Sequence, residues 1–184
     1  GLRFSLSGED LTAALDRHGA MPLPPYIARR RPADAKDRET YQTEFAGEDA
    51  ASVAAPTAGL HFTPRLLSEC DAAGLVRETV HLHVGLGTFK PLEEKQLEEN
   101  RLHEEWRRLT PETAARLNAA RASGHRVVPV GTTAMRTLES CVDADGVLHP
   151  ATGPTDIYLK PGDAVQGTDA LVTNFHLPGS SLFM

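Results

Sequence analysis

The sequence has little cysteine and no long apolar run. Among 184 residues there are two cysteines, Cys70 and Cys141, and they form no CxxC pair. Two distant thiols argue against a disulfide framework, so we expect reduced thiols in a cytoplasmic protein. No stretch approaches the roughly 18 consecutive apolar residues of a membrane-spanning helix, and we expect no membrane partner.

Positive charge is also scarce, because 19 Lys and Arg stand against 25 Asp and Glu, for a formal net charge of −6. This balance excludes a general electrostatic attraction to nucleic acid, so an RNA partner would need a local basic patch. The candidate patch is Arg29-Arg30-Arg31, followed by Lys36 and Arg38. A solvated loop is the more ordinary interpretation of the same charges.

Proline and glycine mark the expected helices. Thr63-Pro64 and Thr110-Pro111 each place an N-cap residue before a proline at the first helical position. The two helices are predicted to end at Gly74 and near Gly124. A capping box at residues 7–10 predicts an earlier helix ending at Gly19, and the three prolines of residues 21–27 predict an extended segment.

Strands are predicted between these helices. Residues 78–84 alternate, which places His81 and His83 on one face, and residues 126–130 form a short apolar strand before a helix through Leu138. Two later strands are predicted over 155–159 and 170–175. The interleaving predicts an α/β fold with a mixed sheet or barrel-like core.

The two ends of the printed sequence are unusually apolar. Residues 2–4 look like a strand, and the sequence stops at Leu182-Phe183-Met184. Because chain termini usually lie at polar surfaces, we expect this chain to be a piece of a larger protein.

The stretch VAAPTAGLHFT, residues 53–63, has no charge but contains Pro56, Gly59 and His61. A glycine allows close approach of the backbone to a bound molecule, and an imidazole can transfer protons. The same residues are also compatible with a turn and a buried core histidine.

Two histidines on one strand face, His81 and His83, have the spacing of a metal-binding pair, with His61 or His103 as a possible third ligand. The adjacent Gly85-Leu86-Gly87-Thr88 lacks the third glycine of a dinucleotide-binding motif. Neither the histidine pair nor the glycine motif is specific evidence for a metal site or a dinucleotide site.

Two further groups contain acid–base or anion-binding residues. His103 and Glu105 share a face if the backbone is extended, although surface charge explains them too.

Gly131-Thr132-Thr133 leads into a helix whose N-terminus could bind an anion, with Arg136 one turn later. The alternative is an ordinary N-cap and a surface pair between Arg136 and Glu139. Asn174 and His176 follow the last predicted strand, where α/β proteins often bind ligands.

Taken in order, these segments resemble the S-adenosylmethionine:tRNA ribosyltransferase-isomerases of queuosine biosynthesis. The matching phrases are MPLPPYI, YQTEFA, VAAPTAGLHF, LHVGLGTF, LHEE, VGTTAMRTLES, TDIYLKPG and DALVTNFHLPGSSLFM. They extend from about Gly19 to Met184. The resemblance implies that residues 1–184 are part of the larger catalytic domain of a multi-domain enzyme, with a small β-rich domain inserted before residue 1 and a further tail after Met184. It implies that such a piece by itself is inactive or poorly soluble.

The resemblance also implies the reaction. The ribosyl group of S-adenosylmethionine is transferred to 7-aminomethyl-7-deazaguanine at the tRNA wobble position and rearranged to epoxyqueuosine, with release of adenine and methionine. S-adenosylmethionine is consumed as a cosubstrate, no metal is expected, and a monomer is the expected state. A base must take a proton from the sugar carbon beside the sulfonium, and an acid must assist adenine departure.

On this basis the catalytic candidates are His61, His83, His103 and Glu105. The substrate-binding candidates are Thr57, Gly59, Gly85, Gly87, Thr88, Gly131, Thr132, Thr133, Arg136, Asn174 and His176. Two positions depart from the family pattern: His81 stands where Thr is usual, and Asn100 stands where the first histidine of D-H-x-M-H-x-E is usual.

Overall fold

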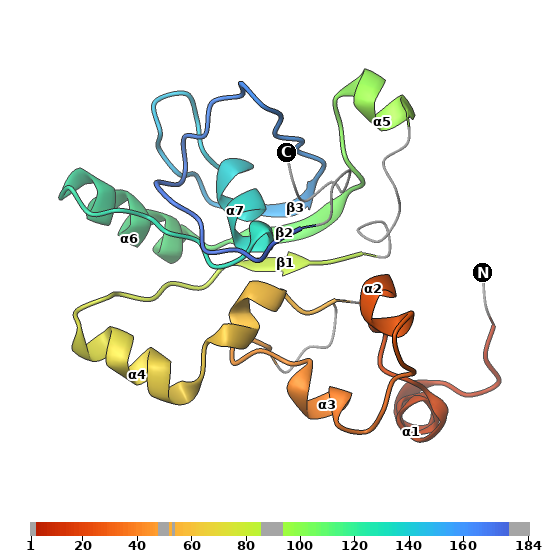
Figure 1. Ribbon diagram of the computed structural model, residues 1–184. Helices are drawn as coiled ribbons and strands as arrows, with labels where there is room; N and C mark the ends of the chain where they lie inside the picture. The colour runs from red at the N-terminus through yellow and green to blue at the C-terminus, as the bar shows by residue number, and fades with distance from the viewer. Residues whose placement is uncertain (1–2, 48–51, 53, 86–93, 177–184) are drawn as a thin grey trace. The chain divides into compact units, whose positions relative to one another are not determined.

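The computed structural model describes residues 3–47, 52, 54–85 and 94–176. The chain divides into two compact units, residues 1–42 and residues 43–184 (Figure 1). No helix in the described ranges is long and apolar enough to cross a membrane. Cys70 and Cys141 are both free thiols.

The first unit contains three helices: α1 Gly8–His18, α2 Pro25–Ala28 and α3 Asp37–Thr40. The bounds of α1 agree with the prediction, and the Gly19 N–H donates to the Leu15 carbonyl at its end. Ser7 is the N-cap but its side chain makes no capping hydrogen bond, so the predicted capping box does not form. α1 buries none of its residues completely.

Two predictions for the first unit are wrong. Phe4 is not in a strand, and its side chain is 54% exposed. The proline-rich segment is not extended throughout, because residues 25–28 make a helical turn. Pro25 is tolerated there because the first residue of a helix needs no hydrogen-bonded N–H.

The predicted basic patch is partly neutralised. Arg31 donates from Nη1 and Nη2 to the buried Asp37 carboxylate at 2.7 and 2.6 Å. Arg38 Nη1 lies 3.4 Å from the carboxylate Oδ1 of Asp16, and Arg38 Nη2 donates to the carbonyl oxygen of Asp16 at 2.5 Å. Only Arg29 and Arg30 of the predicted patch therefore present exposed guanidinium groups without an acidic partner in the described structure.

The second unit is built around a three-stranded antiparallel sheet in the order β1-β2-β3. The strands are β1 His81–His83, β2 Glu105–Leu109 and β3 Ala151–Thr155. In the register, His83 pairs with Trp106 and Trp106 with Pro154, while Leu82 pairs with Arg107 and Arg107 with Gly153. The α/β class is confirmed, and the sheet is small and antiparallel.

Several strand predictions are wrong or incomplete. β1 covers only part of the predicted 78–84, β2 was not predicted, and β3 precedes the predicted strand 155–159. Pro154 is compatible with β3 because β3 is an edge strand. Segments 126–130 and 170–175 share one parallel bridge, Val130 to Val172, instead of forming strands; Pro129 has no N–H to extend the pairing.

The helices of the second unit are η1 Thr57–His61, α4 Pro64–Ala72, α5 Glu94–Glu99, α6 Pro111–Ala122 and α7 Thr132–Glu139. Both Thr-Pro predictions are confirmed. The hydroxyl of Thr63 accepts from the Leu66 N–H, and that of Thr110 accepts from the Thr113 N–H. Gly74 and Gly124, which follow the two helices, have φ values of 83° and 80°.

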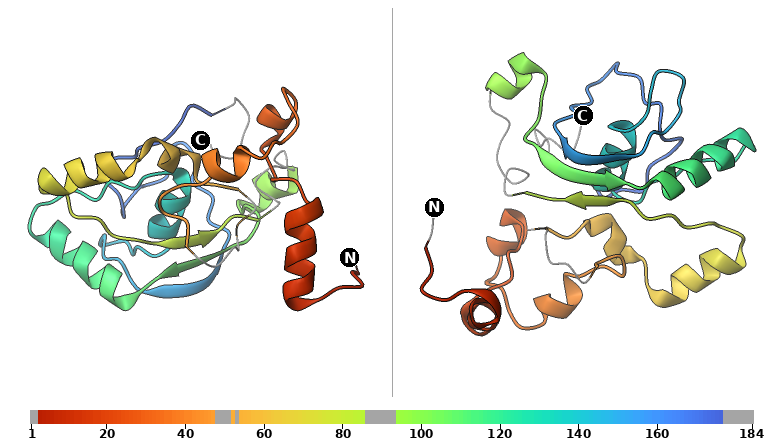
Figure 2. Two further views of the ribbon diagram at one scale, coloured as in Figure 1. Left: turned by 90° about the horizontal axis from the view of Figure 1, so that it is seen from below. Right: turned by 180° about the vertical axis from the view of Figure 1, so that it is seen from behind.

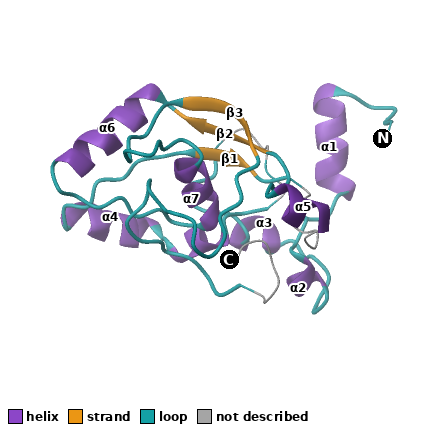
Figure 3. Ribbon diagram, turned by 90° about the horizontal axis from the view of Figure 1, so that it is seen from above, coloured by secondary structure: helices purple, strands orange, loops and turns teal. Residues whose placement is uncertain are grey.

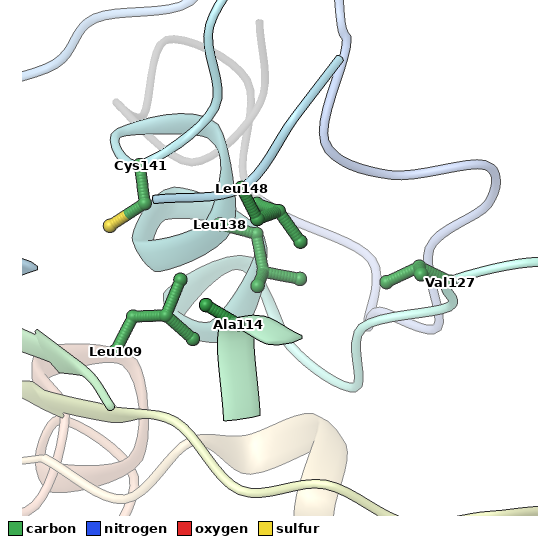
Figure 4. Close-up of a cluster of buried hydrophobic side chains, with 6 residues drawn as sticks. All are labelled: Leu109, Ala114, Val127, Leu138, Cys141 and Leu148. Atoms are coloured by element: carbon green, nitrogen blue, oxygen red, sulfur yellow. The ribbon is translucent and has the colours of Figure 1, made fainter. Parts of the chain in front are cut away.

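The core lies between the sheet and helices α6 and α7. Its buried side chains are Leu109, Ala114, Val127, Leu138, Cys141 and Leu148 (Figure 4). Helix α7 packs against one face of the sheet, as the views in Figures 2 and 3 agree. Arg107 donates to the carbonyl oxygen of Ser140 at 3.3 Å, which places a cation at the negative end of α7.

Candidate functional site

The sheet register gives each strand residue a face. Because directly paired residues of antiparallel strands project to the same side, Glu105, Arg107 and Leu109 share the face that packs on α7. The opposite face carries six residues, which we call the outer face: His81, His83, Trp106, Arg108, Thr152 and Pro154. The two predicted catalytic residues on the strands lie on opposite faces: Glu105 on the α7 side and His83 on the outer face.

On the α7 side, three predicted site residues meet. His103 Nε2 lies 3.3 Å from Glu105 Oε1, and Arg136 Nη1 lies 3.2 Å from Glu105 Oε2. The Arg136 Nη2 group donates to the His103 carbonyl oxygen at 2.8 Å. The prediction that His103 and Glu105 share a face is confirmed, because residues 102–105 lead directly into β2. We call these three residues the His103 cluster.

The His103 cluster is largely shielded from solvent. The side chains of His103, Arg136 and Glu105 are 19%, 14% and 4% exposed. Burial lowers the pKa of Arg136, while the neighbouring Glu105 and Asp156 carboxylates act in the opposite direction. A guanidinium nevertheless remains protonated in proteins, so Arg136 supplies a positive charge beside Glu105. The Gly85 N–H also donates to Glu105 Oε1 at 3.4 Å.

Arg136 is therefore engaged by a carboxylate and by backbone carbonyls of its own chain. An added anion would have to compete with Glu105 for it. The alternative surface pair between Arg136 and Glu139 is wrong, because Glu139 is 6% exposed and accepts hydrogen bonds from residues 166–168. This arrangement fixes the loop that precedes Val172 and Asn174.

A second group forms where η1 meets the segment after Val172. Asn174 Nδ2 donates to Thr57 Oγ1 at 2.8 Å, and Asn174 Oδ1 lies 3.0 Å from His61 Nε2. With its amide nitrogen turned to Thr57, Asn174 presents only an acceptor to His61, so His61 Nε2 must be the donor. In a neutral imidazole the remaining nitrogen, Nδ1, is then an acceptor. We call Thr57, His61 and Asn174 the His61 cluster.

The two clusters are linked through α7. Gly131, the N-cap of α7, donates its N–H to the Val172 carbonyl at 2.8 Å, two residues before Asn174. A Cβ on Gly131 would lie 3.9 Å from both Pro56, the N-cap of η1, and Ala58 in its first turn. Arg136 follows five residues later, about 7.5 Å along the helix axis. One helix thus supports both clusters.

The glycines of the site have structural roles in this arrangement. Gly131 has a φ of 93°, a conformation that favours glycine. A Cβ on Gly59 would lie 3.0 Å from the Phe45 ring and 3.1 Å from Thr43, so Gly59 allows η1 to pack closely on residues 43–45. Contact of Gly59 with a substrate stays a prediction.

His83 does not join either cluster. It lies on the outer face, with its ring centroid 4.6 Å from that of Trp106. His81 is on the same face, as predicted, but no group of three metal-ligating side chains occurs within the described ranges. The paired-histidine interpretation therefore has no third ligand in that part of the chain.

The other predicted residues have less defined surroundings. Thr132 and Thr133 form the first turn of α7, and the Thr133 carbonyl accepts from the Thr137 hydroxyl at 3.1 Å. His176 is half-buried, and burial lowers its pKa, so its imidazole is neutral at pH 7. Gly87 and Thr88 lie outside the described residues.

The contact between Trp106 and His83 was not predicted from the sequence. The signal was present in the alternation of residues 105–109, where Glu105, Arg107 and Leu109 are separated by Trp106 and Arg108. A strand reading of that pentapeptide would have placed Trp106 and Arg108 together on one face.

The chain is similar to known proteins over its whole length. A family model described as queuosine biosynthesis protein matches residues 1–184. The S-adenosylmethionine:tRNA ribosyltransferase-isomerase of Hyphomonas neptunium is 80% identical over 183 residues, which cover 100% of this chain and 52% of that protein. The corresponding protein of Methylorubrum extorquens is 57% identical, again over 100% of this chain and 50% of its own length.

A solved structure is similar as well. The crystal structure of S-adenosylmethionine tRNA ribosyltransferase from Thermotoga maritima matches with a TM-score of 0.54 and 38% identity, over 68% of this chain and 38% of that one. The chain spans about half the length of the curated relatives it matches.

Proposed function

Because the chain belongs to the queuosine biosynthesis protein family over its whole length, we propose that it is part of an S-adenosylmethionine:tRNA ribosyltransferase-isomerase. The reaction transfers the ribosyl group of S-adenosylmethionine to 7-aminomethyl-7-deazaguanine at the tRNA wobble position and isomerises it, releasing adenine and methionine. The proposal includes residues 1–184 as part of the larger catalytic domain of a monomeric, cytoplasmic enzyme.

The main structural support for this chemistry is the geometry of the His103 cluster. Glu105 holds the His103 imidazole at 3.3 Å, and Arg136 holds the other oxygen of Glu105 at 3.2 Å. A carboxylate that holds one ring nitrogen of an imidazole fixes the orientation of the ring, so that the other ring nitrogen can act as a base. We assign His103 to removal of the proton from the sugar carbon beside the sulfonium, which the positive sulfur acidifies.

The His61 cluster supplies a second proton-transfer group. Since Nε2 of His61 donates to Asn174, Nδ1 is the atom available to carry a proton to or from the substrate. We assign His61 to assisting adenine departure, with Asn174 and Thr57 as the residues that set its tautomer. His176, two residues after Asn174, is part of the proposal as a further residue of the substrate pocket.

The test measures adenine release and the mass gain of the wobble base together, in the protein at its natural length with S-adenosylmethionine and precursor tRNA. His103→Ala and His61→Ala should each lower kcat by on the order of 10²-fold, the scale of general acid–base catalysis. His149→Ala is the matched control, because His149 is exposed and hydrogen-bonded to Asp143 outside both clusters. Losses under about threefold for both cluster histidines would contradict the assignment.

A further inference from the structure

The outer face of the sheet combines aromatic rings with an arginine. His83 and Trp106 lie side by side, with centroids 4.6 Å apart and ring planes inclined by 34°. The next rung of the ladder adds His81 and Arg108, which pair directly across β1 and β2. The two rungs lie about 7 Å apart along the strands.

The six residues of the outer face include no carboxylate. Thr152 and Pro154 complete the two rungs on β3. Trp106 is 37% exposed, and His81, Arg108, Thr152 and Pro154 are also exposed. Within residues 43–184, Figure 3 draws α7 against the other face of the sheet and no helix against this one.

This composition favours a nucleic acid over a further protein layer as the binding partner of the outer face. The exposed Glu112 of α6 interacts electrostatically with Arg108, but the six residues of the face itself supply no carboxylate, so burial of Arg108 under a further protein layer would be costly. A nucleic acid instead offers both complements, because bases stack on exposed rings and phosphates neutralise guanidinium groups. The net charge of −6 makes a local cationic face necessary for any such partner.

We propose that the outer face binds single-stranded RNA, with an unpaired base stacked on the Trp106–His83 pair and a neighbouring phosphate at Arg108. This inference rests on the proposed function, which supplies an RNA substrate whose reacting base lies in a loop. It gives His83 a role in RNA binding and separates it from the proton transfers at His103 and His61.

The chain contains a single tryptophan, so its fluorescence reports on Trp106 alone. Titration of the 184-residue chain with a tRNA anticodon stem-loop RNA should quench this fluorescence saturably. By anisotropy of labelled RNA, Trp106→Ala should weaken binding roughly 5- to 150-fold, the range for loss of one stacked base, whereas Trp106→Phe should restore most of the affinity. Arg108→Ser should reduce the slope of log affinity against log salt by about one.

The matched control is Arg65→Ser, since Arg65 is an exposed arginine on α4 whose Glu69 partner lies one turn away. It should leave RNA affinity unchanged. Absence of quenching, or unchanged RNA affinity in Trp106→Ala, would overturn the proposal. A Trp106→Ala variant with a lowered unfolding midpoint and normal RNA affinity would do so too, because it would mean that polypeptide covers the face.

The two proposals fail in different ways. If the natural-length protein releases adenine but Trp106→Ala leaves the KM for tRNA unchanged, the outer face is not the RNA site and the proposed reaction stands. If RNA quenches Trp106 and no adenine is released under any condition, the RNA site stands and the proposed reaction fails.

Discussion

Asn100 has a φ of 55°, the single positive value outside glycine in the described ranges. It follows α5, and the Arg101 N–H donates to the Gln96 carbonyl at 3.1 Å, the six-to-one bond of a Schellman helix end. That end requires the left-handed conformation, in which Asn and His are both enriched. The difference from the histidine usual in the family therefore preserves the backbone conformation.

Asp37 allows a prediction about pH. Hydrogen bonds from Arg31, and a further one from the Asp34 N–H, lower its pKa to about 2. A carboxyl whose pKa is lower in the folded state contributes stability above its ordinary pKa, and this contribution is lost as the pH falls through about 2. Asp37→Asn should therefore lower the denaturant midpoint of the first unit at pH 7, and the difference from the unmodified chain should shrink below pH 4 and vanish near pH 2.

The measurement is chemical denaturation followed by NMR signals of residues 25–41, at several pH values. Asp163→Asn is a suitable control, because Asp163 is exposed and makes its hydrogen bond in the second unit. A midpoint difference that stayed constant from pH 7 to pH 2 would show that charge on Asp37 is not the cause.

At the scale of elements, α4 and α6 begin with the same N-terminal capping motif. Each has a threonine whose hydroxyl accepts an N–H three residues later, followed by proline. Helix α6 also contributes Ala114 to the core, so its start is coupled to global stability. Removing a threonine cap typically costs about 1 kcal/mol.

We therefore expect Thr110→Ala to lower the free energy of unfolding by about 1 kcal/mol. Thr110→Ser should lower it much less, because serine keeps the capping oxygen. Denaturant titration followed by Trp106 fluorescence measures both variants. Equal losses for Ala and Ser would indicate that the Thr110 methyl group, and not the cap, is responsible.

At the scale of the whole molecule, the six buried side chains of the core cluster all belong to residues 43–184. The sheet, α7 and both clusters belong to the same unit, whereas α1 in the first unit buries no residue completely. The second unit thus contains the interactions on which the candidate site depends.

A chain restricted to residues 43–184 should consequently keep a cooperative unfolding transition and the same Trp106 emission maximum. Circular dichroism and fluorescence provide the two measurements, with the 184-residue chain as reference. A non-cooperative transition in the shortened chain would mean that residues 1–42 are required for the second unit to fold.

The sequence by itself determined the features that depend on neighbours a few residues away. These are the two Thr-Pro helix starts, the glycines that follow them, the shared face of His103 and Glu105 and the family to which the chain belongs. The helix starts, the glycines and the shared face each depend on a hydrogen bond or side-chain direction set within about four residues, which local patterns encode. The family is indicated instead by the matching segments along the whole chain.

Only the tertiary structure decided which of these groups meet. The sheet register put His83 with Trp106 on the face opposite Glu105, and Asn174 reaches Thr57 across 117 positions of sequence. Arg136 binds Glu105, and Glu139 binds the loop at 166–168, although they are only three residues apart on one helix. Such pairings depend on how strands align and on which polar groups are buried together, and neither is recorded in the spacing of residues along the chain.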